Sequence, residues 1–119
     1  MSVARIIVVV APDRGLRRSL AFALEVEGYF TESYDALWKA EASAKRALCT
    51  IVDDEILKSE PQTAKFLERP DLRVVLLVDG MTAFKEHGDT IVLTKPINGS
   101  DLVRAVNGLE RIALHRDKI

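Results

Sequence analysis

Four short runs of apolar residues, rich in valine and isoleucine, constrain this chain more than any other feature. They span residues 6–11, 48–52, 74–78 and 90–94, and each is followed by a proline or a charged residue. Because polar residues do not alternate with apolar ones along these runs, the pattern is typical of strands that are buried on both faces. The sequence therefore predicts a parallel sheet with helices on both sides.

Segments with helical spacing lie between these strands. Asp13 is a suitable N-cap for a helix that reaches Glu27, and Gly28 is a suitable residue to end it. Ser100 is the expected N-cap of a final helix that continues to about residue 115. Two further helices are expected over residues 35–47, where Trp38 should pack, and 61–68, and a half-polar edge strand over 29–33.

This alternation predicts a single α/β domain over residues 1–119. Right-handed crossovers favour a doubly wound, five-stranded parallel sheet in the order 2-1-3-4-5. In such a sheet, ligands bind at the carboxyl ends of the strands, near the switch point between the first and third strands. Asp13 and Asp53 follow those two strands, and Lys95 follows the fifth, close enough to reach the same point.

The composition is that of an ordinary globular protein, with 48% hydrophobic and 29% charged residues. A formal net charge of -1 gives no reason to expect nucleic-acid or lipid binding. No apolar stretch approaches the roughly 20 residues that span a bilayer, and no signal peptide precedes Arg5, so we expect a cytoplasmic protein. The one cysteine, Cys49, lies within an apolar run and is expected to be a buried structural thiol.

The chain resembles the receiver domains of two-component response regulators over essentially its full length. The resemblance rests on four motifs in order, each at the end of a predicted element: the first strand followed by Arg17-Arg18, then Glu27-Gly28-Tyr29, Val52-Asp53 and Leu93-Thr94-Lys95-Pro96. It implies a flavodoxin-like receiver fold. Because the segment between Val78 and Lys95 is short, the fourth helix of that fold, over residues 81–87, is expected to be shortened.

The resemblance also implies roles for individual residues. Asp53 would accept a phosphoryl group from a histidine kinase, Lys95 would contact that group, and the bond from Lys95 to Pro96 would be cis. In the family, Mg²⁺ bridges the phosphoryl oxygens, two acids after the first strand, the acceptor aspartate and a backbone carbonyl that belongs here to Glu55. A cation is needed because a carboxylate that attacks a phosphoryl group meets like-charge repulsion.

Several positions depart from the receiver pattern. Ala11 and Pro12 stand where the acid pair is expected, so Mg²⁺ binding is in question. Asp13 is either a substitute metal ligand or only the N-cap of the first helix. Asp54 is expected to point away from Asp53 into solvent, and Asp79 is an open candidate for a further ligand. The hydroxyl and the aromatic ring that report phosphorylation in the family are both replaced by valine, at positions 78 and 92.

Three hypotheses for function follow. The chain is a working phosphoacceptor that uses Asp53 and Lys95, or a pseudo-receiver that binds proteins without phosphorylation, for example by docking on a histidine kinase and restraining it. A pseudo-receiver could also form a homodimer through an exposed helix face. The third hypothesis, an enzyme or small-molecule site on the same scaffold, has no cofactor motif to support it. The sequence is compatible with a stand-alone receiver and with the front of a longer regulator.

Overall fold

Five parallel strands form one sheet in the order β2-β1-β3-β4-β5, as predicted. The computed structural model describes residues 5–80 and 90–117. The strands are β1 (Ile6–Val10), β2 (Phe30–Tyr34), β3 (Cys49–Asp53), β4 (Val74–Val78) and β5 (Ile91–Thr94). Every residue of β3 and β4 is buried, whereas β2 at one edge is only partly covered. The apolar runs at residues 6–11, 48–52 and 74–78 therefore mark the interior of the sheet, whereas the run at residues 90–94 forms β5, an edge strand that is only partly buried and not covered on both faces as expected.

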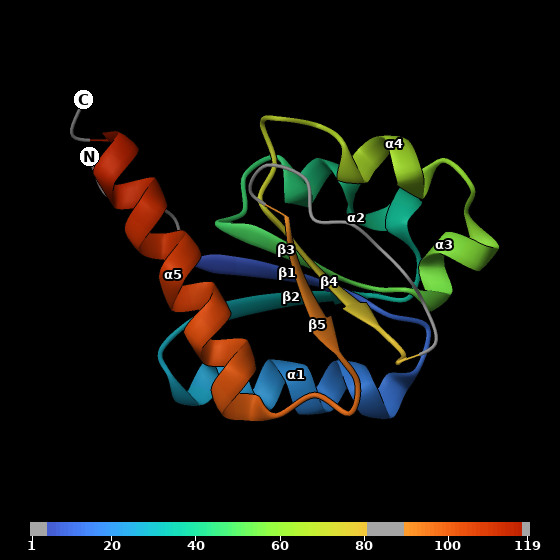
Figure 1. Cartoon of the computed structure of the whole chain (residues 1–119), viewed down its shortest axis with the longest axis horizontal. Helices are drawn as coiled ribbons and strands as arrows, with labels where there is room; N and C mark the ends of the chain where they lie inside the picture. Colours follow the sequence, from blue (N-terminus) through green and yellow to red (C-terminus); the bar gives the residue numbers. More distant parts are fainter. Residues whose placement is uncertain (1–4, 81–89, 118–119) are drawn as a thin grey trace.

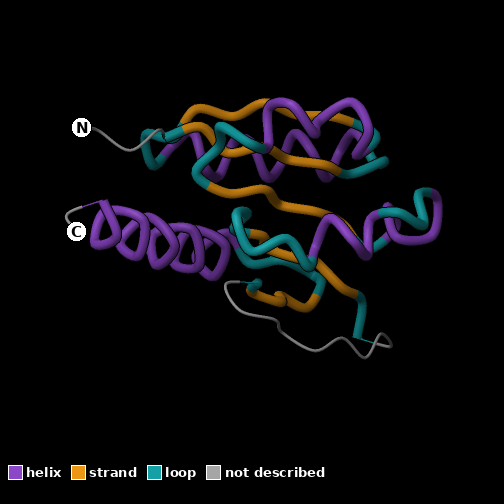
Figure 2. The backbone as a smooth tube through the Cα atoms, turned by 90° about the horizontal axis from the view of Figure 1, so that it is seen from above, coloured by secondary structure: helices purple, strands orange, loops and turns teal. Residues whose placement is uncertain are grey.

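Helices cover both faces of the sheet (Figure 1). On one face lie α1 (Arg14–Val26) and α5 (Gly99–Asp117), and on the other lie α2 (Leu37–Ala44), α3 (Glu55–Ser59) and α4 (Thr63–Leu67). The view from above in Figure 2 shows the strands side by side and α5 as a long helix beside the sheet. Within the described ranges, no helix is both long and apolar enough to cross a membrane.

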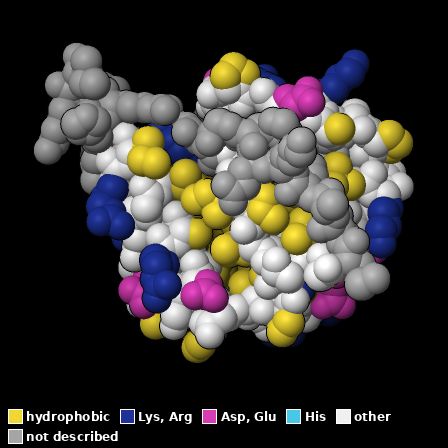
Figure 3. Space-filling model, viewed as in Figure 1, with side chains coloured by type: hydrophobic (Ala, Val, Ile, Leu, Met, Phe, Trp, Pro, Cys, Tyr) yellow, Lys and Arg dark blue, Asp and Glu magenta, His cyan; other side chains and the backbone are white. Residues whose placement is uncertain are grey.

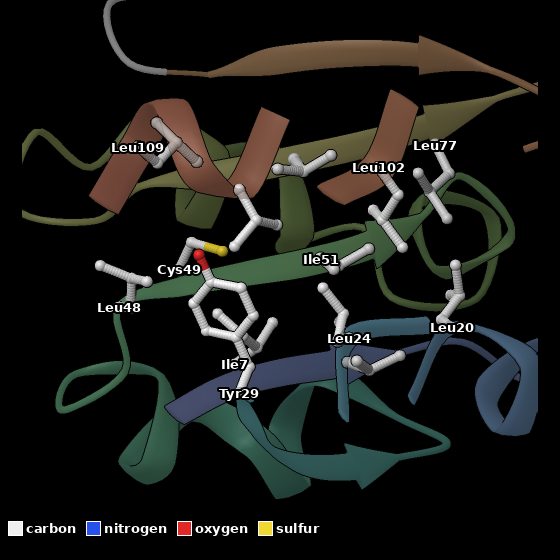
Figure 4. Close-up of a cluster of buried hydrophobic side chains, with 13 residues drawn as sticks. Ile7, Leu20, Leu24, Tyr29, Leu48, Cys49, Ile51, Leu77, Leu102 and Leu109 are labelled. Atoms are coloured by element: carbon white, nitrogen blue, oxygen red, sulfur yellow. The ribbon is translucent and has the colours of Figure 1, made fainter. Parts of the chain in front are cut away.

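Alternate residues of each strand feed two separate hydrophobic cores. Ile7 and Val9 of β1 pack towards α1 and α5, whereas Val8 and Val10 pack towards α2, α3 and α4. Figure 4 shows the first core, in which leucines from both helices meet the middle strands and Tyr29. This division follows from the two-residue period of a strand, which turns successive side chains to opposite faces.

Two of the three predicted helix ends are confirmed. The Asp13 carboxylate accepts the Leu16 amide hydrogen at 2.7 Å and so caps α1. Just beyond its last turn, Gly28 adopts a φ of 92°, a region that strongly favours glycine. Ser100 is not the cap of α5, because the helix begins one residue before it. Asn98 takes that role, and its side-chain oxygen accepts the Ser100 amide hydrogen at 2.7 Å.

The structure corrects two expectations about the α2 side of the sheet. Helix α3 was not expected, since its five residues are too few to display a hydrophobic period. Trp38 does not pack into a helix face: its side chain is 66% exposed, and Leu37, Ala40 and Ala44 are the buried residues of α2. The shortened fourth helix predicted over residues 81–87 lies outside the described residues.

Candidate functional site at the carboxyl edge of the sheet

The carboxyl ends of β3, β4 and β5 bring three charged residues together. Asp53 is the last residue of β3, and Asp54 follows it directly. Lys95 follows β5, and its amide donates a 2.7 Å hydrogen bond to the carbonyl oxygen of Val78 at the end of β4. The arrowheads of β4 and β5 in Figure 1 point towards this edge. The peptide bond between Lys95 and Pro96 is cis, as the resemblance implied.

Asp53 and Lys95 form the expected ion pair. The Lys95 ammonium lies 2.7 Å from Oδ1 of Asp53, whose side chain is only 3% exposed. The two residues are 42 positions apart in sequence, so the contact depends on the strand order rather than on local structure. The structure thus confirms that the aspartate and the lysine meet, while their chemical roles remain predictions.

Asp54 occupies a different place from the one expected. Its side chain is 4% exposed and does not lie in solvent. Oδ1 of Asp54 lies 2.8 Å from the Lys95 ammonium, and Oδ2 accepts the backbone amide hydrogen of Asp79 at 3.1 Å. The expectation of a solvated side chain assumed that the strand continues. Instead the backbone at Asp54 is helical, with φ −62° and ψ −19°, and this conformation ends the alternation of side chains.

The two carboxylates determine the electrostatics of Lys95. Burial of the Lys95 side chain opposes its charge and would lower its pKa. The hydrogen bonds that Lys95 donates to Asp53 and Asp54, together with the negative charges of these carboxylates, outweigh burial and raise the pKa of Lys95 above its usual range. Lys95 is therefore a fixed cation, held between two acceptors.

The predicted metal ligands lie at the start of α1, at the end of β3 and at the start of α3. Asp13 is exposed and caps α1. The ligand predicted from Glu55 is its backbone carbonyl, which accepts a 3.4 Å hydrogen bond from the Ser59 hydroxyl, while its exposed side chain lies 3.4 Å from the Lys58 ammonium. The described part of the chain contains no group of three histidine, cysteine, aspartate or glutamate side chains that could hold a metal ion. Asp53 and Asp54 both lie within 2.8 Å of the Lys95 ammonium.

A second cation lies where the acid pair of a receiver would begin. The Arg17 guanidinium donates hydrogen bonds of 2.7 Å and 2.8 Å to the backbone carbonyls of Ala11 and Pro12. These carbonyl oxygens are therefore already engaged, and Ala11 is fully buried without a ligand atom in its side chain. No signal in the sequence distinguishes Arg17 from the neighbouring Arg18, so this contact could not be predicted.

Comparison with known proteins shows the family to which the chain belongs. No protein-family model matches the chain. It is 58% identical over 104 residues to the transcriptional regulator protein FixT of Rhizobium meliloti strain 1021, an alignment that covers 87% of this chain and 90% of that protein. The chain belongs to the FixT family.

The fold of this FixT-family protein is that of response regulator receiver domains. A receiver domain protein from Bacillus halodurans C-125 superposes with a TM-score of 0.72 at 14% identity, covering 87% of this chain and 95% of that one. A receiver protein from Burkholderia phymatum gives a TM-score of 0.69 at 19% identity, covering 88% and 94% of the two chains. The fold class and the strand order predicted from the sequence are thereby confirmed.

Two positions where receivers carry reporter groups are apolar in this FixT-family chain. Val78 ends β4, is 3% exposed and belongs to the core beneath α2, α3 and α4. Val92 of β5 is partly buried against the same core. Neither valine side chain has a donor or acceptor that could form a hydrogen bond with a phosphoryl group. At these two positions the side chains contribute only apolar packing.

Proposed function

We propose that this chain is a phosphorylation-independent receiver, an interaction module that acts on a partner protein within a two-component pathway. The observation that carries the proposal is the closed charge cluster in which Lys95 bridges the buried carboxylates of Asp53 and Asp54. Phosphoryl transfer would require a divalent cation beside Asp53 and an incoming anion beside Lys95. In this arrangement the ammonium group of Lys95 already lies 2.7 Å from the carboxylate of Asp53 and 2.8 Å from that of Asp54.

The surface favours a protein partner over nucleic acid. Lysine and arginine side chains lie among aspartate and glutamate on the face shown in Figure 3, without a continuous basic patch. Phe22 and Val26 on α1 are 62% and 68% exposed, although large apolar side chains are usually buried. They line a groove of about 570 Å³ between α1 and α5, together with Val103 and Arg104. An apolar floor with charged edges is typical of protein interfaces.

A histidine kinase of a two-component pathway is the partner class we propose, since the receiver fold is the scaffold that such kinases engage. FixT, to which the chain is 58% identical, is a transcriptional regulator protein, which supports a role in signalling. By docking on a kinase, this module would restrain or redirect its output without itself carrying a phosphoryl group. A homodimer through the groove formed by α1 and α5 is the competing use of the same surface.

A working phosphoacceptor is the second candidate, and the Asp53–Lys95 contact of 2.7 Å favours it. Intact-mass analysis after incubation with Mg²⁺ and a small phosphodonor separates the two candidates. We expect no phosphoryl adduct under conditions that label an ordinary receiver. A magnesium-dependent adduct on the wild type that is lost in Asp53→Asn would establish the phosphoacceptor instead.

Binding experiments test the interaction directly. Purified sensor histidine kinases from the source organism would be titrated with the wild type, Asp53→Asn and Phe22→Asp. We expect Asp53→Asn to bind like the wild type and Phe22→Asp to lose most of its affinity. Phe30→Asp is a matched control, because Phe30 is 70% exposed and does not line the groove. Equal losses for Phe22→Asp and Phe30→Asp would contradict the assignment of the surface.

A further inference from the structure

The carboxylate of Asp54, which follows β3, contacts residues at the ends of two other strands. One oxygen lies 2.8 Å from the ammonium of Lys95, which follows β5, and the other accepts the Asp79 amide hydrogen, which follows β4, at 3.1 Å. Both oxygens are thus used inside the protein. A buried carboxylate is costly unless such partners compensate for its lost hydration.

The position of Asp54 in the backbone makes this contact more informative. Asp54 immediately precedes α3, where an aspartate usually bonds to amides of the first helical turn. Its side chain makes no such cap bond. The local structure therefore does not explain why an acid stands here, and the Lys95 and Asp79 donors do.

An ammonium group beside a backbone amide hydrogen is a binding arrangement for an oxyanion. The Lys95 ammonium supplies a full charge, and the Asp79 amide supplies a directed donor at a strand end. Such donors suit the oxygens of a phosphate or phosphoryl group as well as those of a carboxylate. The place next to Asp53 is thus a small oxyanion site that already holds an anion from the chain itself.

We propose that Asp54 is a resident anion that fills the oxyanion site formed by the Lys95 ammonium and the Asp79 amide, and thereby keeps phosphate out of it. This proposal rests on the proposed function, a receiver that acts without phosphorylation, because Asp54 would then stabilise the Lys95 ammonium and the Asp79 amide in place of a phosphoryl group. Two carboxylates and one ammonium also leave the cluster with a net charge of −1 (−2 + 1), which repels a further anion. Removal of Asp54 would leave Asp53 and Lys95 as a neutral pair and would remove the carboxylate that accepts the Asp79 amide hydrogen.

Titration with inorganic phosphate tests this assignment. The probe is the ¹⁵N-labelled protein, with the amide resonance of Asp79 as the reporter and chloride at matched ionic strength as the reference. We expect Asp54→Ala to bind phosphate at least about tenfold more tightly than the wild type, with a saturable shift at Asp79. Asp54→Ser is a second variant, and its smaller cavity guards against loss of folding.

Glu55→Ala is the matched control, since it also removes one negative charge, from the residue next to Asp54 in sequence, but leaves Asp54 in place. Its affinity for phosphate should stay at the wild-type level. The proposal is overturned if the folded Asp54 variants bind phosphate no better than the wild type, or if Glu55→Ala gains as much. These outcomes are independent of the phosphodonor experiment, because they report reversible binding to a variant rather than a covalent adduct on wild-type Asp53.

Discussion

The carboxylate of Glu60 accepts a 2.6 Å hydrogen bond from the backbone amide of Leu37, 23 residues earlier in the chain. Its second oxygen accepts the Trp38 amide at 3.0 Å. Ala36, at the N-cap position of α2, has no side-chain acceptor, and so the end of α3 supplies the missing cap. The N-terminus of α2 is therefore capped by Glu60, which follows α3, and not by a residue at its own N-cap position.

Substitution of Glu60 tests this remote cap. We expect Glu60→Ala to lower the free energy of unfolding by about 2 kcal/mol, because two buried amides lose a charged acceptor. Urea denaturation measures the effect. Glu55→Ala, with its exposed side chain, should change stability by no more than about 0.5 kcal/mol, and similar losses for both variants would contradict the cap.

Removal of the Lys95 charge should expose the cost of the two carboxylates. Lys95→Met leaves Asp53 and Asp54 buried without their cation, and we expect a loss of about 3–5 kcal/mol at neutral pH. Urea denaturation measures this loss. A change in the free energy of unfolding of less than about 1 kcal/mol would contradict the role of Lys95 as the cation that holds the two carboxylates.

The pKa of Lys95 itself predicts the behaviour of the wild type. Since the pKa is raised in the folded state, the stabilisation from Lys95 is complete below the ordinary lysine pKa. It decreases only as the pH rises through the higher value of the folded protein. Stability measured from neutral to mildly alkaline pH should therefore show no loss from this group.

Tyr29 should give the protein a distinct alkaline transition. Burial, followed by the charge of Glu110 and a hydrogen bond to it, raises the pKa of Tyr29 from 10.0 to about 12. The hydroxyl also donates a 2.6 Å hydrogen bond to Asn107 of α5. Because the folded state favours the protonated phenol, its stabilisation is complete below pH 10 and is lost as the pH rises towards 12.

The variant Tyr29→Phe separates this effect from general alkaline denaturation. It should cost about 1 kcal/mol at neutral pH, since it removes the part-buried hydrogen bonds of the phenol to Asn107 and Glu110, and it should flatten the loss of stability between pH 10 and pH 12. Ultraviolet titration of the phenols provides a second measurement. A wild type and a variant with the same alkaline profile would refute the role of Tyr29.

Cys49 should be chemically silent in the folded protein. It is 1% exposed, and burial raises the pKa of its thiol to about 12, so that little thiolate forms at neutral pH. A thiol-specific chromogenic reagent should label the native protein only on the timescale of unfolding and label one thiol at once in denaturant. Rapid stoichiometric labelling of the native state would contradict the buried position.

The strands and the main ion pair could be predicted because they depend on simple patterns. The apolar runs predict the positions of the strands, and the order of the strands predicts that Asp53 and Lys95 lie close together. Asp54 and Glu60 could not be predicted in the same way. The direction of Asp54 depends on where β3 gives way to a helical backbone, and Glu60 acts on an element 22 residues away, without any periodic signal.

If Asp54 occupies the oxyanion site, this also affects how long a signal from the protein lasts. In a phosphorylated receiver, water eventually cleaves the bond between the aspartate and the phosphoryl group, and this hydrolysis limits the duration of the signal. The anion proposed here is a side chain of the polypeptide, so water has no such bond to break. If a partner binds this form of the protein, hydrolysis cannot end the interaction. The duration of the complex would be set by its dissociation and by the lifetime of the protein in the cell.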